Sequence, residues 1–167
     1  MARGPRIILL ALAGLGLTLT GCGFTPLYAT PGVSSNLAGI TVQTPPGRVE
    51  YLLREQLEDA LGRDKTKPAQ WRLDISTVQT RDPRGLTLSN VAERYVLGLT
   101  VKYVLTSLQT GKPAYSGEVR TEVTYDAANA PYAGIAARQD SQDRAAADAA
   151  RRIQVELAAW MTSHRGG

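Results

Sequence analysis

The sequence predicts an α+β fold, in which a four-stranded, mostly antiparallel or mixed sheet carries two helices packed on one face. In the middle of the chain, apolar and polar residues alternate over three long segments, as they do in half-buried strands. On either side of these segments lie a Leu-rich and an Ala-rich stretch, both with apolar residues at helical spacing. One apolar and one largely polar face on each strand indicate a sheet that is covered on one side only.

Composition and length set the broad class. The 167 residues are 43% hydrophobic and 20% charged, which is close to an ordinary globular chain of one domain. This argues against a wholly disordered protein and against a membrane protein with several spans. A single Cys excludes an internal disulfide, and with a single His it argues against a Cys/His zinc site.

The first residues form a targeting segment. Arg3 and Arg6 precede an apolar run from Ile7 to Leu19, which is short for a bilayer span and typical of a signal peptide. Leu19-Thr20-Gly21-Cys22 then resembles a bacterial lipobox, so we predict that residues 1–21 are removed and that Cys22 is lipidated. A plain secretory signal with an incidental Cys is the alternative. Two basic residues leave with the signal, and the formal charge falls from +4 to +2, so nucleic acid is not an expected partner.

The expected domain plan follows from turn and helix signals. Residues 22–38 contain Pro26, Pro31 and Ser34-Ser35-Asn36 and are interpreted as an extended, lipidated tether. Residues 39–163 form a single α+β domain, and residues 164–167 form a disordered tail. The domain opens with a short strand in which Ile40 and Val42 alternate with polar residues. A helix follows, and Gly62 is its expected C-cap. Its apolar positions are Val49, Leu52, Leu53, Leu57, Ala60 and Leu61.

Three strands come next. The first contains Trp71, Leu73 and Ile75, and a change of phase at Thr77-Val78 predicts a bulge there. Asp82-Pro83-Arg84-Gly85 is interpreted as a turn, and Gln109-Thr110-Gly111-Lys112 as a hairpin turn. The apolar face of the second long strand is Tyr95, Leu97, Leu99, Val101, Tyr103 and Leu105, and that of the third is Tyr115, Val119, Val123 and Tyr125.

A long helix is expected after Pro131. Its predicted apolar stripe consists of Ile135, Gln142, Ala146, Ala149, Ile153, Leu157 and Trp160. This helix should lie beside the first helix on the apolar face of the sheet.

Catalytic patterns are not found. The sequence has no phosphate loop and no nucleophile elbow, and its one His, His164, is interpreted as a solvated tail residue. Glu118 and Glu122 share a strand face with Arg120 between them, which favours a ladder of cross-strand charges over a pair of catalytic carboxylates. We therefore predict that the protein is not an enzyme and needs no cofactor or metal.

A binding role is the remaining hypothesis. By their parity, Arg72, Arg94, Lys102 and Arg120 could share the exposed sheet face and hold phosphates or carboxylates. The alternative is a solvated face balanced by nearby acids, and spacing alone favours that alternative. The expected loop with Arg81 and Arg84 is also basic.

Several segments resemble one known family. Cys22-Gly23-Phe24-Thr25-Pro26-Leu27-Tyr28 is similar to the mature start of the LPS-assembly lipoproteins of the LptE type. Other similar segments are Tyr51-Leu52-Leu53-Arg54-Glu55, Arg94-Tyr95, Tyr125-Asp126 and Tyr132-Ala133-Gly134-Ile135-Ala136-Ala137-Arg138-Gln139-Asp140. The order of elements also resembles this family, most closely its alphaproteobacterial branch.

The resemblance implies a place and a set of partners. It implies an outer-membrane lipoprotein, lipid-anchored on the periplasmic side. Such a protein plugs and helps to assemble an LptD-type β-barrel and binds lipopolysaccharide on its way to the outer leaflet. The four basic residues named above are then candidate lipopolysaccharide contacts. Two other roles remain open at this point: an auxiliary lipoprotein of an ABC-type lipid transporter, and a structural envelope lipoprotein.

Overall fold

The computed structural model describes residues 33–86, 92–126 and 131–164. The signal segment, Cys22 and most of the predicted tether lie outside the described residues, as do residues 165–167 of the predicted tail. The elements in order are α2 (Val33–Ala38), β1 (Ile40–Gln43), α3 (Arg48–Ala60), β2 (Trp71–Leu86), β3 (Ala92–Ser107), β4 (Pro113–Asp126) and α4 (Pro131–Ser163). None of the helices in these ranges combines the length and the apolar character needed to cross a bilayer.

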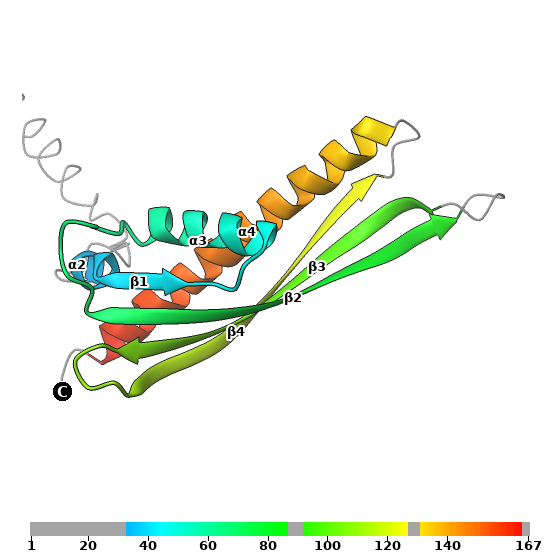
Figure 1. Cartoon of the computed structure of the whole chain (residues 1–167). Helices are drawn as coiled ribbons and strands as arrows, with labels where there is room; N and C mark the ends of the chain where they lie inside the picture. Colours follow the sequence, from blue (N-terminus) through cyan, green and yellow to red (C-terminus); the bar gives the residue numbers. More distant parts are fainter. Residues whose placement is uncertain (1–32, 87–91, 127–130, 165–167) are drawn as a thin grey trace, which may run out of the picture.

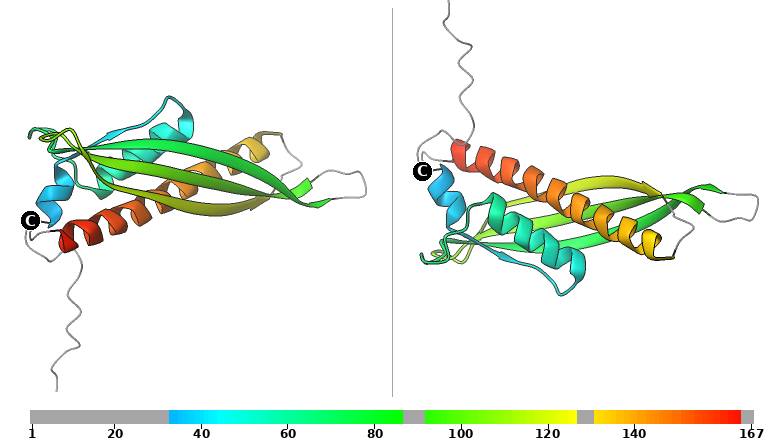
Figure 2. Two further views of the ribbon diagram at one scale, coloured as in Figure 1. Left: turned by 90° about the horizontal axis from the view of Figure 1, so that it is seen from below. Right: turned by 90° about the horizontal axis from the view of Figure 1, so that it is seen from above.

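The four strands form one mixed sheet in the order β1-β2-β3-β4 (Figure 1). β1 pairs in parallel with β2, and the two hairpins β2–β3 and β3–β4 are antiparallel. Both α3 and α4 lie on the same face of the sheet, and the other face is left uncovered (Figure 2). The predicted α+β class, with two helices packed on one face, is confirmed.

Alternation places the predicted apolar side of β3 in the core. Leu97, Leu99, Val101, Tyr103 and Leu105 are each at most 1% exposed, because their parity turns them toward the helices. On β4 the same layer holds the predicted Tyr115, Val119, Val123 and Tyr125, with Thr121 buried among them. Thr121 tolerates this place because its hydroxyl donates a hydrogen bond to the carbonyl of Ala145 at 3.4 Å.

The predicted stripe of α3 faces the core. Val49, Leu53 and Leu57 are buried, and the chain leaves the helix through Gly62, whose φ of 63° is the left-handed conformation of a helix C-terminus. The C-cap residue itself is Leu61, so the C-cap predicted at Gly62 is displaced by one residue, and Gly62 is the residue that follows the cap.

α4 uses small residues to approach the sheet and α3 closely. Ala145, Ala146, Ala149 and Ala150 are at most 1% exposed, and the larger Ile153 and Leu157 follow them. The predicted stripe is right from Gln142 onward and wrong at Ile135. The side chain of Ile135 is 56% exposed, because the first turns of α4 run beyond the part of the core that α3 covers (Figure 1).

β2 differs from its prediction in two respects. The expected bulge at Thr77-Val78 is absent from the β2–β3 pairing, which runs in regular register through Thr77↔Val101 and Val78↔Thr100. The expected turn at Asp82 to Gly85 is wrong as well, because the strand continues to Leu86. β1 stops pairing at Asp74, so beyond that point no other described strand pairs with the outer edge of β2, and an edge strand tolerates Pro83.

The connections at the other end agree better with prediction. Ser107 and Lys112 close the β3–β4 hairpin with a backbone hydrogen bond of 3.0 Å, and Gly111 supplies the positive φ of the predicted turn. Residues 33–38, expected to belong to the extended tether, form α2 instead. This short helix is fixed by Leu37, which is 2% exposed in the core.

Candidate functional site

The uncovered face of the sheet carries the candidate binding residues. Arg72, Arg94, Lys102 and Arg120 lie on this face, as their parity predicted, and all four side chains are exposed. They do not form one cluster, however. Arg72 pairs with Thr106 of β3, and Arg94 lies twelve residues away from Thr106 on the same strand. The two arginines are therefore separated by roughly 40 Å along the sheet.

Lys102 and Arg120 are the two that come together. Glu118 lies directly across from Lys102 in the β3–β4 register, and it contacts Lys102 Nζ at 3.6 Å and Arg120 Nη2 at 2.7 Å. One carboxylate therefore serves two cations. The expected ladder of cross-strand charges is present at Glu118, and a pair of catalytic carboxylates is not formed with Glu122, which lies opposite Gly98.

Arg72 is neutralised locally. Its Nε donates to Asp74 at 2.9 Å on the same strand and the same face. This is the balanced arrangement expected of a solvated surface, and an anion at Arg72 would have to compete with that carboxylate.

Arg94 belongs to a different environment at the distal end of the β2–β3 hairpin, where the strands extend past α3 (Figure 1). It is paired with Asp126 at 2.9 Å, and directly opposite it on β2 stands Arg84. No hydrogen bond or ion pair to a described residue involves the Arg84 guanidinium. Like charges placed opposite one another across two strands repel, while Asp82, two residues before Arg84 on the same exposed face of β2, and Asp126 place two carboxylates at this end of the sheet.

A concavity of about 450 Å³ lies at these two arginines, lined by Arg84, Gly85, Arg94 and Asp126. Two guanidinium groups beside a small concavity are suited to a phosphate or carboxylate, because each presents a fork of N–H donors. Sequence reasoning noted Arg84 as part of a basic loop. It did not place Arg84 beside Arg94, since that requires the strand to continue through Pro83.

The inner face at the same end is also basic. The guanidinium of Arg81 lies 3.6 Å from the ring centroid of Tyr95, and Tyr95 stacks in turn on Tyr125 at 5.6 Å. Cation–π contact holds Arg81 against the sheet without neutralising its charge. Arg81, Arg84 and Arg94 thus place three cations near the tip of the hairpin, which we call the tip cluster.

The centre of the inner face contains a partly buried polar contact. Tyr103 is 1% exposed, and its hydroxyl donates a hydrogen bond to Glu156 of α4. Burial raises the pKa of the Tyr103 phenol, and the neighbouring Glu156 carboxylate raises it further. A phenol that keeps its proton this firmly is a structural donor and is unsuited to acid–base catalysis at neutral pH.

His164 does not form a site. Its ring is exposed, stacks on Trp160 at 4.9 Å and lies 3.0 Å from the carbonyl oxygen of Trp160 at the end of α4. Within the described residues, no group of His, Cys, Asp or Glu side chains is arranged to hold a metal ion.

Comparisons with known proteins place the fold in a family. The LptE profile, described as lipopolysaccharide-assembly, matches residues 37–157. A crystal structure of a protein designated a lipoprotein, from Caulobacter crescentus CB15, is 44% identical, with a TM-score of 0.71 over 81% of this chain and 99% of that one. No curated protein matches the chain significantly.

More distant structures share the fold alone. Rare lipoprotein B from Shewanella oneidensis is 16% identical, with a TM-score of 0.56 over 74% of this chain and 95% of that one. A minor lipoprotein from Acinetobacter baumannii is 17% identical, with a TM-score of 0.56 over 72% of this chain and 90% of that one.

The resemblance noted in the sequence is therefore confirmed, and the Caulobacter relative agrees with the alphaproteobacterial branch. The family profile covers most of the chain, from the end of α2 to the last turns of α4. The chain belongs to the LptE family of lipopolysaccharide-assembly proteins, a family of structural lipoproteins rather than enzymes.

Proposed function

We propose that this protein is an outer-membrane lipoprotein, anchored through Cys22, that plugs an LptD-type β-barrel and helps to assemble it. In this role it binds lipopolysaccharide during transport to the outer leaflet. Family membership supports the assembly role, and the lipobox supports the anchor.

The plug role is supported by shape and polarity. The body is elongated, because β3 has 16 residues and α4 has 33, so that both extend for roughly 50 Å. Its uncovered sheet face carries exposed charges in place of an apolar patch. A polar surface of this kind suits the water-filled interior of a large barrel.

The observation that carries the lipopolysaccharide role is the pair of opposed arginines Arg84 and Arg94. Of the two, Arg94 alone has an ion-pair partner among the described side chains, Asp126, and an arriving phosphate would relieve the repulsion between the two guanidinium groups. Arg72, Lys102 and Arg120 are proposed as secondary contacts. They would bind more weakly, because each would exchange an existing carboxylate partner for the phosphate.

Affinity purification of the tagged mature protein from native membranes tests the partner. We expect an LptD-type barrel in stoichiometric amount, identified by mass spectrometry. Recovery of a transporter ATPase in its place would favour the auxiliary-lipoprotein role, and recovery of neither would favour a structural envelope role. A tagged lipoprotein of the same membrane that lacks this domain serves as the control.

A further inference from the structure

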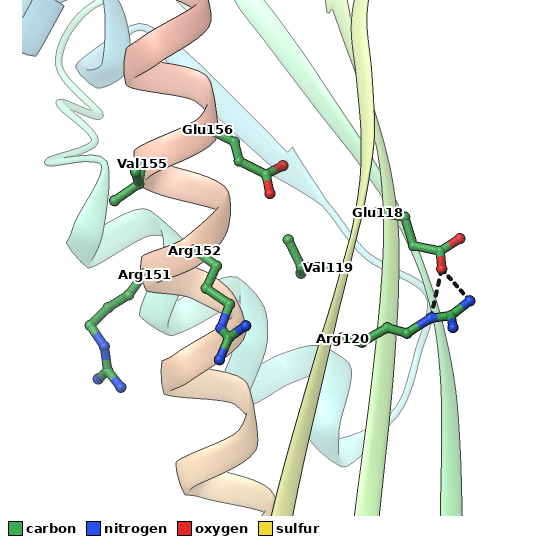
Figure 3. A pocket seen from close by; sticks show the side chains of 7 residues that line it. All are labelled: Glu118, Val119, Arg120, Arg151, Arg152, Val155 and Glu156. Carbon is green, nitrogen blue, oxygen red and sulfur yellow. Dashed lines mark hydrogen bonds and ion pairs between the residues drawn. The ribbon is translucent and has the colours of Figure 1, made fainter.

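Two concavities lie between β4 and α4 on the side of the molecule away from β1. One, about 450 Å³, is lined by Glu118 to Arg120 of β4 and by Arg151, Arg152, Val155 and Glu156 of α4 (Figure 3). The other, about 390 Å³, lies along Glu122 to Thr124 and the preceding turns of α4. They share Arg151 and follow one another along β4, and we call them together the β4 groove.

The wall of the β4 groove is the free edge of the sheet. β4 is the last strand in the order β1-β2-β3-β4, so within the part of the chain that the structure describes one side of its backbone has no strand partner. Such an edge presents unpaired N–H and C=O groups that can accept another strand. The groove follows this edge from Glu118 to Thr124, a length of roughly 20 Å, which is the length of about six residues in extended conformation.

Apolar groups lie exposed beside this edge. Val155 of α4 is 49% exposed and lines the same concavity as Val119. A strand added to β4 would place every second side chain on the inner side of the sheet, between Val119 and α4.

The charges on the α4 side favour acidic side chains at those positions. Arg151 and Arg152 both contact Asp148, at 3.5 and 3.0 Å, so one carboxylate serves two guanidinium groups. The other acid, Glu156, accepts a hydrogen bond from Tyr103 and lies between α4 and β4 with Arg152 (Figure 3). Further along, Arg144 is paired with Asp140 outside the groove.

The outer face sets the second half of the pattern. There Glu118, Arg120 and Glu122 alternate along β4, and Glu118 is already paired with Lys102 and Arg120, so the outer side of an added strand meets charges of both signs and favours neither. An incoming strand is therefore best matched when its acidic residues face α4 and its neutral residues face outward.

We propose that the β4 groove binds an extended, acidic segment of a partner protein by strand addition, with alternate carboxylates directed to Arg151 and Arg152. This interaction goes beyond the proposed lipopolysaccharide contact, lies on a different edge of the molecule from the tip cluster, and does not depend on it.

A model peptide tests the proposal on the mature full-length protein. The probe is a fluorescent peptide of about seven residues in which Thr and Glu alternate, with both ends blocked; its counterpart carries Lys in place of Glu. We expect the Glu peptide to bind and to slow hydrogen exchange at alternate amides of residues 118–124. The combined change Arg151→Glu and Arg152→Glu should weaken its binding at least about tenfold and transfer the preference to the Lys peptide.

A matched control removes the effect of net charge. Arg54→Glu with Arg138→Glu changes the total charge equally, outside the β4 groove, and should leave peptide binding within about twofold of the parent. Equal weakening by the control pair would overturn the proposal, as would binding without slowed exchange on β4. If vesicles containing phosphatidylglycerol displace the peptide while hydrogen exchange on β4 stays unchanged, the arginines bind an anionic membrane surface, and strand addition is wrong. Lipopolysaccharide binding by the parent protein is measured in a separate titration, so a negative result for the peptide leaves the proposed lipopolysaccharide role untouched, and the reverse also holds.

Discussion

The ring of Tyr103 on β3 occupies the space above Gly117, its direct partner on β4, and reaches across it to Glu156 on α4. A Cβ at Gly117 would collide with the phenol oxygen and would lie 3.0 Å from Cε1. The absence of a side chain on one strand thus allows the largest fully buried side chain of the sheet to join three elements.

Gly117→Ala should destabilise the fold by about 1–3 kcal/mol, the usual range for overpacking a well-filled core. Equilibrium unfolding in urea measures this. The same change in a Tyr103→Leu background should cost markedly less, because the obstructing ring is gone. An equal cost in both backgrounds would mean that the effect comes from the strand backbone and not from Tyr103.

The same phenol should make stability fall at high pH. Its pKa is raised in the folded protein, so its contribution is fully present below the unfolded value of about 10 and is lost as pH rises above it. Between pH 10 and 11 the free energy of unfolding should decrease by up to about 1 kcal/mol more in the parent than in Tyr103→Phe. Identical slopes in the two proteins would exclude this origin.

Much of the fold could be predicted because alternation is local. The parity of β3 determines which side chains reach the core, and no distant contact is needed to recognise it. The predicted bulge in β2 was wrong because the residues that pack against the inner side of this strand change from apolar to polar along its length. From Thr77 onward the inner side of β2 is polar: Thr77 donates a hydrogen bond to Glu50 at 2.5 Å, and Gln79 accepts one from Gln142 at 3.4 Å. In the sequence, these polar residues at inward positions look like a change of phase, although the strand pairing continues in regular register.

The candidate site was less predictable for a related reason. Parity placed the four basic residues on one face, and the structure agrees. Which of them are neutralised depends on partners in other strands, such as Asp126 beside Arg94 and Glu118 between Lys102 and Arg120. These pairings follow from the register of the strands, which the sequence does not show directly. At the distal end the register also requires β2 to continue through Pro83, which is possible because this side of β2 is a sheet edge.

Leu99→Ala should cost about 2–5 kcal/mol, because Leu99 is 1% exposed at the centre of the sheet and its removal leaves a cavity. Val78→Ala is the matched control: Val78 lies in the adjacent strand, is 61% exposed on the opposite face, and should change stability by less than about 0.5 kcal/mol. Thermal unfolding of both variants checks the assignment of the two faces, and equal losses would contradict it.

Lipid attachment at Cys22 should anchor the protein in the outer membrane. Cys22→Ser removes the thiol that would accept the diacylglyceryl group, so acylation and signal removal should both stop. Intact-mass analysis of the parent should show a mature chain that begins at Cys22 and carries acyl chains. A mature parent protein with an unmodified Cys22 would refute the anchor. The domain itself should fold without the lipid, since its core begins at Leu37.

Lipopolysaccharide binding should depend most on the tip of the β2–β3 hairpin. Arg84→Glu with Arg94→Glu removes the two opposed guanidinium groups, leaves a like-charge pair in their place and replaces the Arg94–Asp126 ion pair by two facing carboxylates, so thermal unfolding of the variant must first show that it is folded. Charge-assisted contacts to phosphate contribute about 1.5–3 kcal/mol each when well aligned, and salt reduces this at exposed sites. We therefore expect at least about tenfold weaker binding at low ionic strength, measured by titration of purified lipopolysaccharide.

The comparison variant is Lys102→Glu with Arg120→Glu, which makes the same change of charge near Glu118. It should weaken binding by a smaller factor, because these cations already share a carboxylate. Barrel co-purification should survive both double changes if the barrel uses other surfaces. Binding by the tip variant as tight as that of the parent would show that the tip arginines are only a solvated end of the sheet. A larger loss in the Lys102 and Arg120 variant would move the site to the middle of that face.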